Sequence, residues 1–341
     1  MARALLFLLA LAAFQISGAQ DYAIGADLSF LKQAEDGGFA FRENGEVRPG
    51  LDLFRDHGYQ WIRLRLFHSP DRLPNNLEYT IALAKEAKRR GYKFLLDYHY
   101  SDTWADPGKQ FLPKAWEDLS FEDLVEAVYA YTLQTMTAFR DSSVYPDMVQ
   151  VGNEISNGFL WPHGKLPDHW DQFAKLQRAG INGVLASCGD QPCPKIMVHI
   201  DKGGNKAFTQ YWYDKFNAYA IPYDVIGQSY YPWWHGNLLE LRENMQFMAT
   251  TYKKDIILVE VAYNWTPTEY REKAAPFPET PEGQKAFLEE VNRIVMETPD
   301  NKGKGIFWWE PAVARRGSRS FFDEEGNVLP VITLFDKFTR H

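Results

Sequence analysis

Short apolar runs rich in β-branched residues alternate along the chain with longer stretches in which apolar residues recur every three or four positions. The first pattern is typical of buried strands and the second of amphipathic helices. A strand followed by a helix recurs eight times, and only the first connection, around residues 50–57, is short. We expect strands at residues 22–29, 59–67, 93–100, 148–154, 195–200, 225–231, 256–262 and 305–310, and helices at residues 78–90, 121–139, 168–187, 206–219, 237–252, 281–297 and 331–339.

This alternation determines the expected fold class. Strands that alternate with helices form parallel sheets, and eight such units predict a closed (β/α)8 barrel. A doubly wound open sheet is the alternative, but no glycine-rich phosphate-binding turn follows the first expected strand. No linker, low-complexity tract or short repeat divides the chain, so we expect a single α/β TIM-barrel domain over residues 20–341.

The N-terminal residues follow a different pattern. Arg3 precedes an apolar run, and Ser17 and Ala19 are small residues placed before a cleavage point. Because the run is too short and wrongly flanked to span a membrane, it predicts a signal peptide at residues 1–19. No cysteine lies near the cut for lipid attachment, so we expect a secreted or periplasmic protein that is not inserted in a membrane.

The chain has two cysteines, Cys188 and Cys193. Without nearby histidines they make a poor zinc site, and in an oxidising compartment a small-loop disulfide is expected.

Charge and composition limit the partner. The net charge is −8 and no basic run occurs, so the electrostatic signature of nucleic acid binding is missing. An acidic polymer would also be repelled, which favours a neutral partner. Aromatic residues make up 15% of the chain, and some cluster beside polar residues at expected strand ends, as platforms for stacking sugar rings would. We expect a monomer that binds a neutral polysaccharide.

Two of the expected strands end in a lone glutamate, Glu154 after residues 149–151 and Glu260 after residues 256–259. Active sites of (β/α)8 barrels lie at the C-terminal ends of the strands. Acid-assisted cleavage of a glycosidic bond needs one carboxyl group that faces the leaving oxygen and another that faces the anomeric carbon. The two glutamates are therefore candidate catalytic residues, expected about 5 Å apart. The alternative for each is a structural ion pair.

Side-chain alternation predicts which of these residues point into the barrel. In the strand at residues 256–262, it puts Glu260 on the lumen face together with Ile256 and Leu258. In the strand at residues 148–154, it would put Asn153 and Glu154 on opposite faces. Both reach a substrate only if the strand bulges or ends there, which Gly152 permits. Asn153 would then bind a sugar hydroxyl, and its alternative is a turn residue.

Arg63 and Arg65 share one face of an expected strand whose other face is aliphatic, so both should point into the barrel. A buried guanidinium needs carboxylate partners, and Asp27, Asp97 and Glu260 are the candidates. The alternative is an ion-pair network without a catalytic part. In the functional interpretation, at least one arginine keeps Glu260 ionised, as a nucleophile requires.

Hydrogen-bonding and aromatic residues gather after three other strands. We expect sugar contacts from His99, Asp102, Trp104, Tyr230, Tyr231 and Trp309. With Asn153, the charged residues Asp27, Arg63 and Arg65 complete the expected substrate-binding set. Asp97 and His99 could instead bind a metal ion, but no second histidine follows at ligand spacing. We expect no metal ion and no cofactor at this site.

Five segments together resemble the endo-β-1,4-galactanases of glycoside hydrolase family 53. They are residues 25–29 (GADLS), 97–110 (DYHYSDTWADPGKQ), 151–154 (VGNE), 227–234 (GQSYYPWW) and 309–311 (WEP). The resemblance covers residues 22–315, essentially the whole chain after the signal peptide. One departure is residues 260–265, which read EVAYNW where the family often has ETAYPW.

The resemblance implies a retaining (β/α)8 glycosidase, with Glu154 as general acid/base and Glu260 as nucleophile. It implies β-1,4-galactan, the neutral side chain of pectin and arabinogalactan type I, as substrate. Some bacterial members look calcium-stabilised, and here residues 323–327 form the dense acidic cluster in the corresponding region. The alternatives are another retaining barrel glycanase (a β-mannanase, xylanase or cellulase) and a non-catalytic oligosaccharide-binding protein.

Overall fold

The computed structural model describes residues 22–267, 275–313 and 319–338, so the expected signal peptide lies outside the described residues. Eight parallel strands close into a barrel in the order β1, β12, β11, β10, β9, β6, β5, β4. The (β/α)8 prediction is therefore confirmed. The strands are β1 (Ala23–Asp27), β4 (Trp61–Leu66), β5 (Lys93–Tyr98), β6 (Met148–Val151), β9 (Lys195–Ile200), β10 (Val225–Tyr230), β11 (Asp255–Val261) and β12 (Gly303–Trp308).

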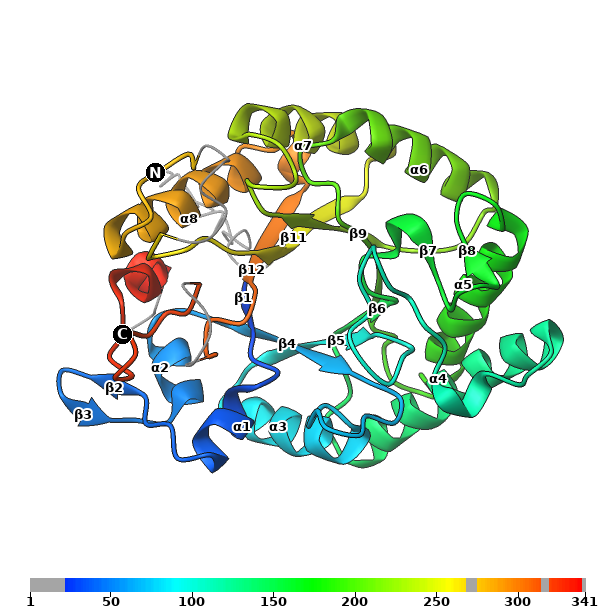
Figure 1. The fold of residues 1–341 in the computed structure, drawn as a ribbon, viewed down its shortest axis with the longest axis horizontal. Helices are drawn as coiled ribbons and strands as arrows, with labels where there is room; N and C mark the ends of the chain where they lie inside the picture. Colours follow the sequence, from blue (N-terminus) through cyan, green and yellow to red (C-terminus); the bar gives the residue numbers. More distant parts are fainter. Residues whose placement is uncertain (1–21, 268–274, 314–318, 339–341) are drawn as a thin grey trace, which may run out of the picture.

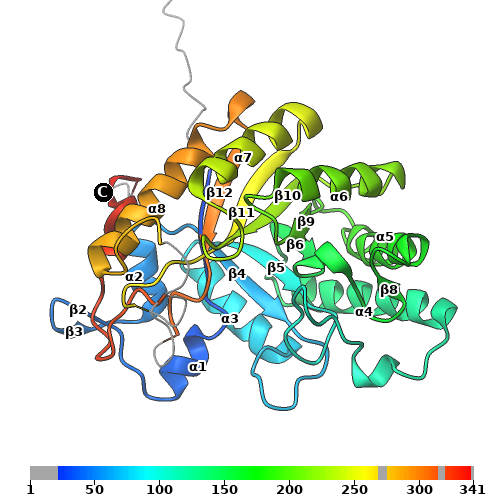
Figure 2. The same ribbon diagram turned by 45° about the horizontal axis from the view of Figure 1, so that its top comes forward.

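The helices form a ring around the barrel, as Figure 1 shows, and Figure 2 shows the same arrangement from an inclined direction. Six expected helices are confirmed within two residues at each end, and the short first connection is also helical. The last segment is a 3₁₀ helix, η4 (Pro330–Phe338), and a short helix, α1, was not expected. The helices are α1 (Leu31–Asp36), α2 (Gly50–Asp56), α3 (Leu77–Arg89), α4 (Phe121–Asp141), α5 (Trp170–Ala186), α6 (Lys206–Ala218), α7 (Leu238–Tyr252) and α8 (Pro281–Met296).

Polar N-cap residues explain where most of these helices begin. The Asn76 side chain accepts a hydrogen bond from the Tyr79 backbone N–H at the start of α3, and Ser120 caps α4 in the same way. Asn237 and Glu240 form a capping box on α7. Each cap satisfies a backbone N–H group that the helix leaves unpaired, so the chain leaves each loop at a defined residue.

The lower, N-terminal part of the barrel lumen is apolar. It contains a cluster separate from the main core, formed by Ala23, Leu95, Met148, Met197, Val225, Ile257, Val259 and Phe307. The charged side chains of Arg63, Asp97 and their neighbours occupy the next layer toward the C-terminal ends of the strands. The apolar layer closes the barrel floor, so the polar layer faces only the C-terminal mouth.

The alternation argument for β11 was wrong, although Glu260 does reach the lumen. Ile257 and Val259 belong to the lumen cluster, whereas Ile256 and Leu258 pack in the main core with the helices. The register of β10 and β11 shifts between Gln228 and Ser229, so that Ser229 lies opposite Glu260. This β-bulge places Val259 and Glu260 on the same side of the strand.

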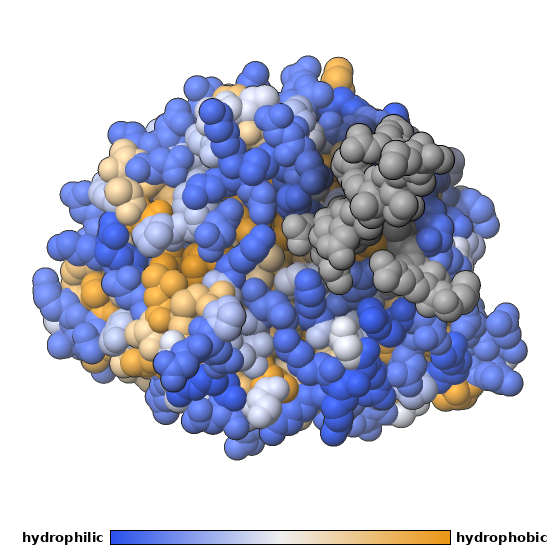
Figure 3. Space-filling view, turned by 180° about the vertical axis from the view of Figure 1, so that it is seen from behind, coloured by the Kyte–Doolittle hydropathy of each residue, from blue (hydrophilic) through white to orange (hydrophobic). Residues whose placement is uncertain are grey.

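Other features lie outside the barrel. Cys188 and Cys193 form the expected disulfide in the loop after α5, which confirms that prediction. Two small hairpins, β2 (Arg42–Glu43) with β3 (Glu46–Val47) and β7 (Gly158–Phe159) with β8 (Gly164–Lys165), decorate the loops. Within the described residues, no helix is both long and apolar enough to cross a membrane. Figure 3 shows that the face behind that of Figure 1 is largely hydrophilic, with an apolar area toward one side.

The barrel floor yields a first prediction. A Cβ atom at Gly25 would lie 2.3 Å from two ring atoms of Phe307, so Gly25→Ala overpacks the lumen. We expect this change to lower the free energy of unfolding by about 1–3 kcal/mol in urea denaturation. Adding Phe307→Leu should restore part of the loss because it removes the ring. An alanine at Gly25 without any loss of stability would contradict this packing.

Candidate active site

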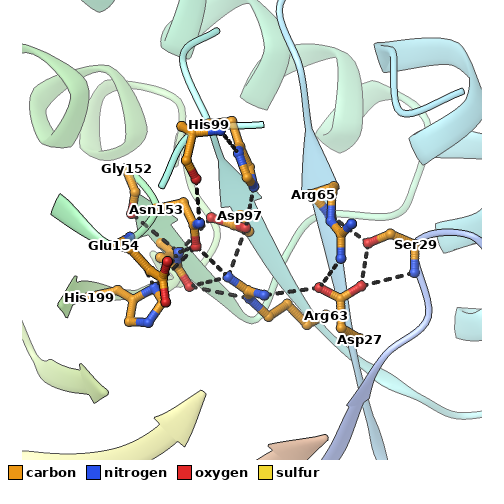
Figure 4. A network of polar contacts seen from close by, with 12 residues as sticks. Asp27, Ser29, Arg63, Arg65, Asp97, His99, Gly152, Asn153, Glu154 and His199 are labelled. Carbon is orange, nitrogen blue, oxygen red and sulfur yellow. Dashed lines mark hydrogen bonds and ion pairs between the residues drawn. The ribbon is translucent and has the colours of Figure 1, made fainter. Parts of the chain in front are cut away.

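A cleft of about 760 Å³ opens at the C-terminal ends of the strands. Both expected catalytic glutamates lie in its wall, each less than a tenth exposed. Other residues expected at the site line it too: Arg63, Arg65, His99, Trp104, Asn153, Tyr231 and Trp309. Figure 4 shows the polar network beneath the cleft, in which side chains from β1, β4, β5, β6 and β9 converge.

Glu154 reaches the cleft because β6 ends before it. The strand stops at Val151, and Gly152 takes φ +91°, where the absence of a Cβ avoids strain. Glu154 itself lies in the left-handed region at φ +47°, at the start of the 3₁₀ helix η2 (Ile155–Asn157). The expectation that Gly152 allows both Asn153 and Glu154 to face the site is thus confirmed.

Asn153 is held from two sides. Its Nδ2 donates to the Ala105 carbonyl at 2.8 Å, and its Oδ1 accepts from Arg63 at 2.8 Å. The Gln110 side chain supports the same turn by donating to the Asn153 carbonyl at 2.8 Å. These contacts fix the turn that carries Glu154, so Asn153 is more than an ordinary turn residue.

Glu154 lies in surroundings that favour its protonated form. Burial raises the pKa of Glu154 well above its usual value, and the negative charges of Glu260 and Asp201 raise it further. The Ser229 hydroxyl donates to Oε1 of Glu154 at 2.6 Å, which acts in the opposite direction. A carboxyl group of this kind can carry a proton near neutral pH.

Glu260 has different contacts. Its Oε1 lies 2.8 Å from a guanidinium nitrogen of Arg63, and its Oε2 accepts from the Tyr231 hydroxyl at 2.9 Å. Burial raises the pKa of Glu260 as well, but the positive charge of Arg63 opposes this. Since Glu154 has no ion-pair partner of this kind among the described residues, a proton shared by the two groups belongs on Glu154.

The two carboxyl groups are close together. One carboxylate oxygen of each glutamate and one ring nitrogen of His199 lie within 4.8 Å of one another. This agrees with the expected separation of about 5 Å, which is typical of retaining glycosidases, whereas inverting enzymes keep their carboxyl groups about 6.5–9.5 Å apart. The arrangement offers a proton donor and an ionised nucleophile on one cleft.

Arg63 joins the carboxylates under the cleft. The guanidinium lies 2.9 Å from Asp27, 2.8 Å from Asp97 and 2.8 Å from Glu260, and its side chain is 1% exposed. Burial raises the pKa of Asp27, but the charges of Arg65 and Arg63 outweigh it and hold that pKa below its usual value. All three carboxylate partners expected for the buried arginines are therefore present.

A second group of charges supports the aromatic walls. Glu310 accepts from Arg65 at 2.6 Å and also from Arg319. The Arg65 guanidinium lies 4.2 Å from the ring centre of Trp104, and that of Arg319 lies 4.0 Å from the ring centre of Trp309. Cation–π contacts of this length hold the indole planes in place.

The described residues that could bind a metal ion are already engaged. In the trio Glu154, His199 and Glu260, both nitrogens of His199 make hydrogen bonds to Ser229 and to backbone or amide groups. His99 uses one nitrogen on Asp97 and the other on the Ala105 N–H.

The acidic cluster raised as a calcium site is also engaged by its own loop. The Asp323 carboxylate accepts from the backbone N–H groups of Glu325 and Asn327 at 3.0 and 2.8 Å and so closes a turn. The Asp323 carboxylate therefore serves to hold its own loop.

Three expected substrate contacts lie elsewhere. Tyr230 points to the helix side, where its ring stacks on Phe287 and its hydroxyl donates to the Gly236 carbonyl. This follows from alternation, since Tyr231 next to it faces the cleft. Asp102 binds the backbone N–H groups of Ser69 and Lys114 and so braces a loop. Asp27 lies beneath the cleft as a partner of the arginines.

Sequence reasoning missed several site residues, among them Gln150, His199, Ser229, Glu310 and Arg319. His199 is a lone polar residue in the apolar strand β9, which is the kind of signal that identified Glu260. Gln150 has the same signature in β6, whereas Ser229 follows another polar residue, Gln228, in β10. Arg319 gives no such signal, because it comes from a loop after the last strand.

A closed (β/α)8 barrel with two buried carboxyl groups this close at its C-terminal mouth defines a glycoside hydrolase. Comparison with known families makes the class specific: residues 23–341 match the family model described as glycosyl hydrolase family 53. The chain belongs to that family.

Individual relatives agree with this assignment. An uncharacterized protein of Niallia circulans is 41% identical, over 85% of this chain and 84% of its own. An arabinogalactan endo-β-1,4-galactanase of Cellvibrio japonicus is 34% identical, over 95% of this chain and 94% of its own. A structure from a study of two fungal β-1,4-galactanases superposes with a TM-score of 0.86 at 31% identity, covering 92% of this chain and 99% of the other.

The network around Arg63 yields a second prediction. Arg63→Met leaves the carboxylates of Asp27, Asp97 and Glu260 buried without their common partner, and we expect a loss of about 3–5 kcal/mol in the free energy of unfolding at pH 7. Urea denaturation measures this loss. Arg293→Met is the control, because Arg293 makes only exposed ion pairs and its removal should hardly move the midpoint. Equal effects of the two changes would contradict the central place of Arg63.

Proposed function

We propose that the protein is a retaining endo-β-1,4-galactanase, with Glu154 as general acid/base and Glu260 as nucleophile. The observation that carries the proposal is the close approach of two carboxyl groups in unlike surroundings. One carboxylate oxygen of Glu154 and one of Glu260 lie within 4.8 Å of each other, but only Glu260 is paired with Arg63. Double displacement needs this difference, because one carboxyl must start protonated and the other ionised.

In the first step, Glu154 protonates the glycosidic oxygen while Glu260 attacks the anomeric carbon. The bond to the leaving sugar breaks, and a galactosyl ester forms on Glu260. Arg63 and the Tyr231 hydroxyl hold Glu260 oriented before the attack. Asn153, whose amide is fixed by Arg63 and the Ala105 carbonyl, borders the cleft beside Glu154 and can bind a sugar hydroxyl.

In the second step, Glu154 accepts a proton from water, which attacks the anomeric carbon and releases Glu260. Two inversions give net retention. The pKa of Glu154 falls when Glu260 is esterified, because the negative charge that raised it is gone. The same carboxyl can thus serve as an acid in the first step and as a base in the second.

The substrate assignment rests on the relatives. Curated relatives such as that of C. japonicus are named arabinogalactan endo-β-1,4-galactanases, and the galactan chain is neutral, as the net charge of −8 favours. Trp104, Tyr231 and Trp309 supply aromatic faces for stacking of sugar rings in the cleft. We further propose an exported monomer that needs no metal ion, with export supported by the pattern of residues 1–19.

Removal of either glutamate tests the catalytic assignment. Glu154→Ala should lower kcat on β-1,4-galactan by about 10²–10⁴-fold, since general acid–base catalysis contributes that much. Glu260→Ala should reduce hydrolysis to background. Release of reducing ends measures both. Glu289→Gln, on the exposed face of α8, is the control and should leave turnover unchanged.

Azide separates the two roles. With an activated aryl galactobioside, Glu154→Ala should form the β-galactobiosyl azide, because azide replaces the water that Glu154 would activate. Glu260→Ala should form the α-azide, because azide enters on the face left by the nucleophile. NMR of the products distinguishes the anomers, and the opposite pattern would show that the roles are exchanged.

A panel of neutral polysaccharides tests the substrate. We expect the wild-type protein to release oligosaccharides from purified β-1,4-galactan, and far fewer from mannan, xylan or cellulose, as measured by reducing ends and product sizing. Faster cleavage of one of the other polymers would assign a different glycanase. Tight binding of galactan without cleavage would indicate a carbohydrate-binding protein.

A further inference from the structure

Glu154 ends a short chain of buried hydrogen bonds that runs through two other strands. The Oγ of Ser229 on β10 lies 2.6 Å from Oε1 of Glu154, and Nε2 of His199 on β9 lies 2.8 Å from the same Oγ. Ser229 and His199 are both fully buried. A serine hydroxyl has one proton to donate, so the direction of this chain depends on which nitrogen of His199 carries hydrogen.

The hydrogen-bond donors around the ring decide which nitrogen of His199 carries the proton. The backbone N–H of Glu154 points to Nδ1 at 3.3 Å. The Gln150 amide nitrogen also lies 3.0 Å from Nδ1. The orientation of that amide is set by Arg63, which donates to the Gln150 Oε1 at 3.2 and 3.3 Å. The Gln150 amide has two hydrogens and also faces Asp97 Oδ1 at 2.6 Å, Asn153 Oδ1 at 3.0 Å and the Gly152 carbonyl at 3.2 Å, so it need not donate to Nδ1. The Glu154 N–H is a fixed donor, so Nδ1 must accept from it, and the ring proton lies on Nε2.

The remaining partner of Nδ1 fits the same assignment. The Asn153 Oδ1 lies 3.2 Å from Nδ1 and could accept from it, but this oxygen already accepts from Arg63 at 2.8 Å and faces the Gln150 amide at 3.0 Å. A proton on Nδ1 would also face the backbone N–H group of Glu154. Burial lowers the pKa of His199 well below its usual value, so the ring stays neutral with one proton.

We propose that His199 and Ser229 form a hydrogen-bond chain of fixed direction that confines the acid proton of Glu154 to Oε2, the carboxyl oxygen left free toward the cleft. Nε2–H of His199 donates to Ser229, so the Ser229 hydroxyl must donate to Oε1 of Glu154. Oε1 is then an acceptor whether Glu154 is ionised or protonated. Within the described residues no hydrogen bond reaches Oε2.

This inference rests on the proposed function and adds two positioning residues to it. In the first step the proton leaves from Oε2 to the glycosidic oxygen, and in the second step Oε2 takes a proton from water. No proton passes through Ser229 or His199. A carboxyl without this chain would distribute its proton over both oxygens, and the population with the proton on Oε1 could not act on the substrate.

Other charges around Glu154 affect its titration but not the choice of oxygen. The negative charges of Glu260 from β11 and Asp201 after β9 raise the pKa of Glu154, and the positive charge of Arg63 from β4 lowers it. Glu154 in turn raises the pKa of Tyr231 after β10, and His99 and His235 act on His199. The Ser229 hydrogen bond is the one interaction among them that lowers the pKa of Glu154 by direct donation to a carboxyl oxygen.

The first test observes His199 directly. Long-range ¹H–¹⁵N spectra of the histidine rings, assigned with a His199→Gln variant, should show His199 as the neutral Nε2–H form from pH 5 to pH 8. A neutral Nδ1–H form, or protonation of the ring within this range, would overturn the proposal. This test needs no substrate, so its failure is distinct from a failure of the galactanase assignment.

The second test removes the hydroxyl. Ser229→Ala should lower kcat on β-1,4-galactan about 10–100-fold with KM nearly unchanged, a part of the full contribution of acid catalysis. It should move the alkaline limb of kcat/KM to higher pH, because loss of the Ser229 hydrogen bond raises the pKa of Glu154 and the acid form persists longer. Cleavage of a 2,4-dinitrophenyl galactobioside, whose leaving group needs no proton, should change less than about threefold in kcat/KM.

Two variants complete the test. Ser229→Thr keeps the hydroxyl and should restore the alkaline limb and most of kcat. Ser187→Ala removes another buried hydroxyl, which bonds to Tyr145 outside the cleft. It should change neither the cleavage rate of the two substrates nor the pH profile. Equal losses on galactan and on the activated substrate in Ser229→Ala, with an unmoved alkaline limb, would show a merely structural role and contradict the proposal.

Discussion

The interaction on which the site depends is the buried guanidinium of Arg63. It contacts carboxylates from three strands and is the one cation that all three share at this depth, where an unpaired charge is costly. Three buried or half-buried arginines and five carboxyl groups meet at this end of the barrel: Arg63, Arg65, Arg319, Asp27, Asp97, Glu154, Glu260 and Glu310. Negative charge is in excess even when Glu154 is protonated. The proton therefore stays on Glu154, the carboxyl group that no arginine contacts. Electrostatics alone thus gives two glutamates of similar burial different protonation states.

Much of this arrangement could be predicted from the sequence because it follows from period and charge. Arg63 and Arg65 alternate with aliphatic residues along β4, and a buried arginine requires acidic partners, so a charged lumen layer was expected. The eight repeats of strand and helix led to the barrel, and the barrel led to the mouth at which Glu154 and Glu260 meet. These inferences need only local pattern and the general geometry of parallel strands.

Other parts could not be predicted because they depend on register between strands. Strict alternation gave the correct side for Glu260 with the wrong neighbours, since the bulge beside Ser229 exchanges the faces of β11. A bulge of this kind leaves no mark in a single strand. Tyr230 and Tyr231 are adjacent aromatic residues of equal appearance, and only the pleat of β10 decides which of them faces the cleft. Ser229 and His199 become meaningful only when β6, β9 and β10 lie side by side.

The acid proton is controlled in the end by the backbone of the residue that carries it. Glu154 adopts a left-handed conformation, which costs a non-glycine residue about 1–2 kcal/mol. In that conformation its N–H group points to Nδ1 of His199 and so forces the ring proton onto Nε2. His199 then orients Ser229, and Ser229 donates back to the Glu154 side chain. The strained turn after Gly152 thus both brings the carboxyl to the cleft and selects the oxygen that holds its proton.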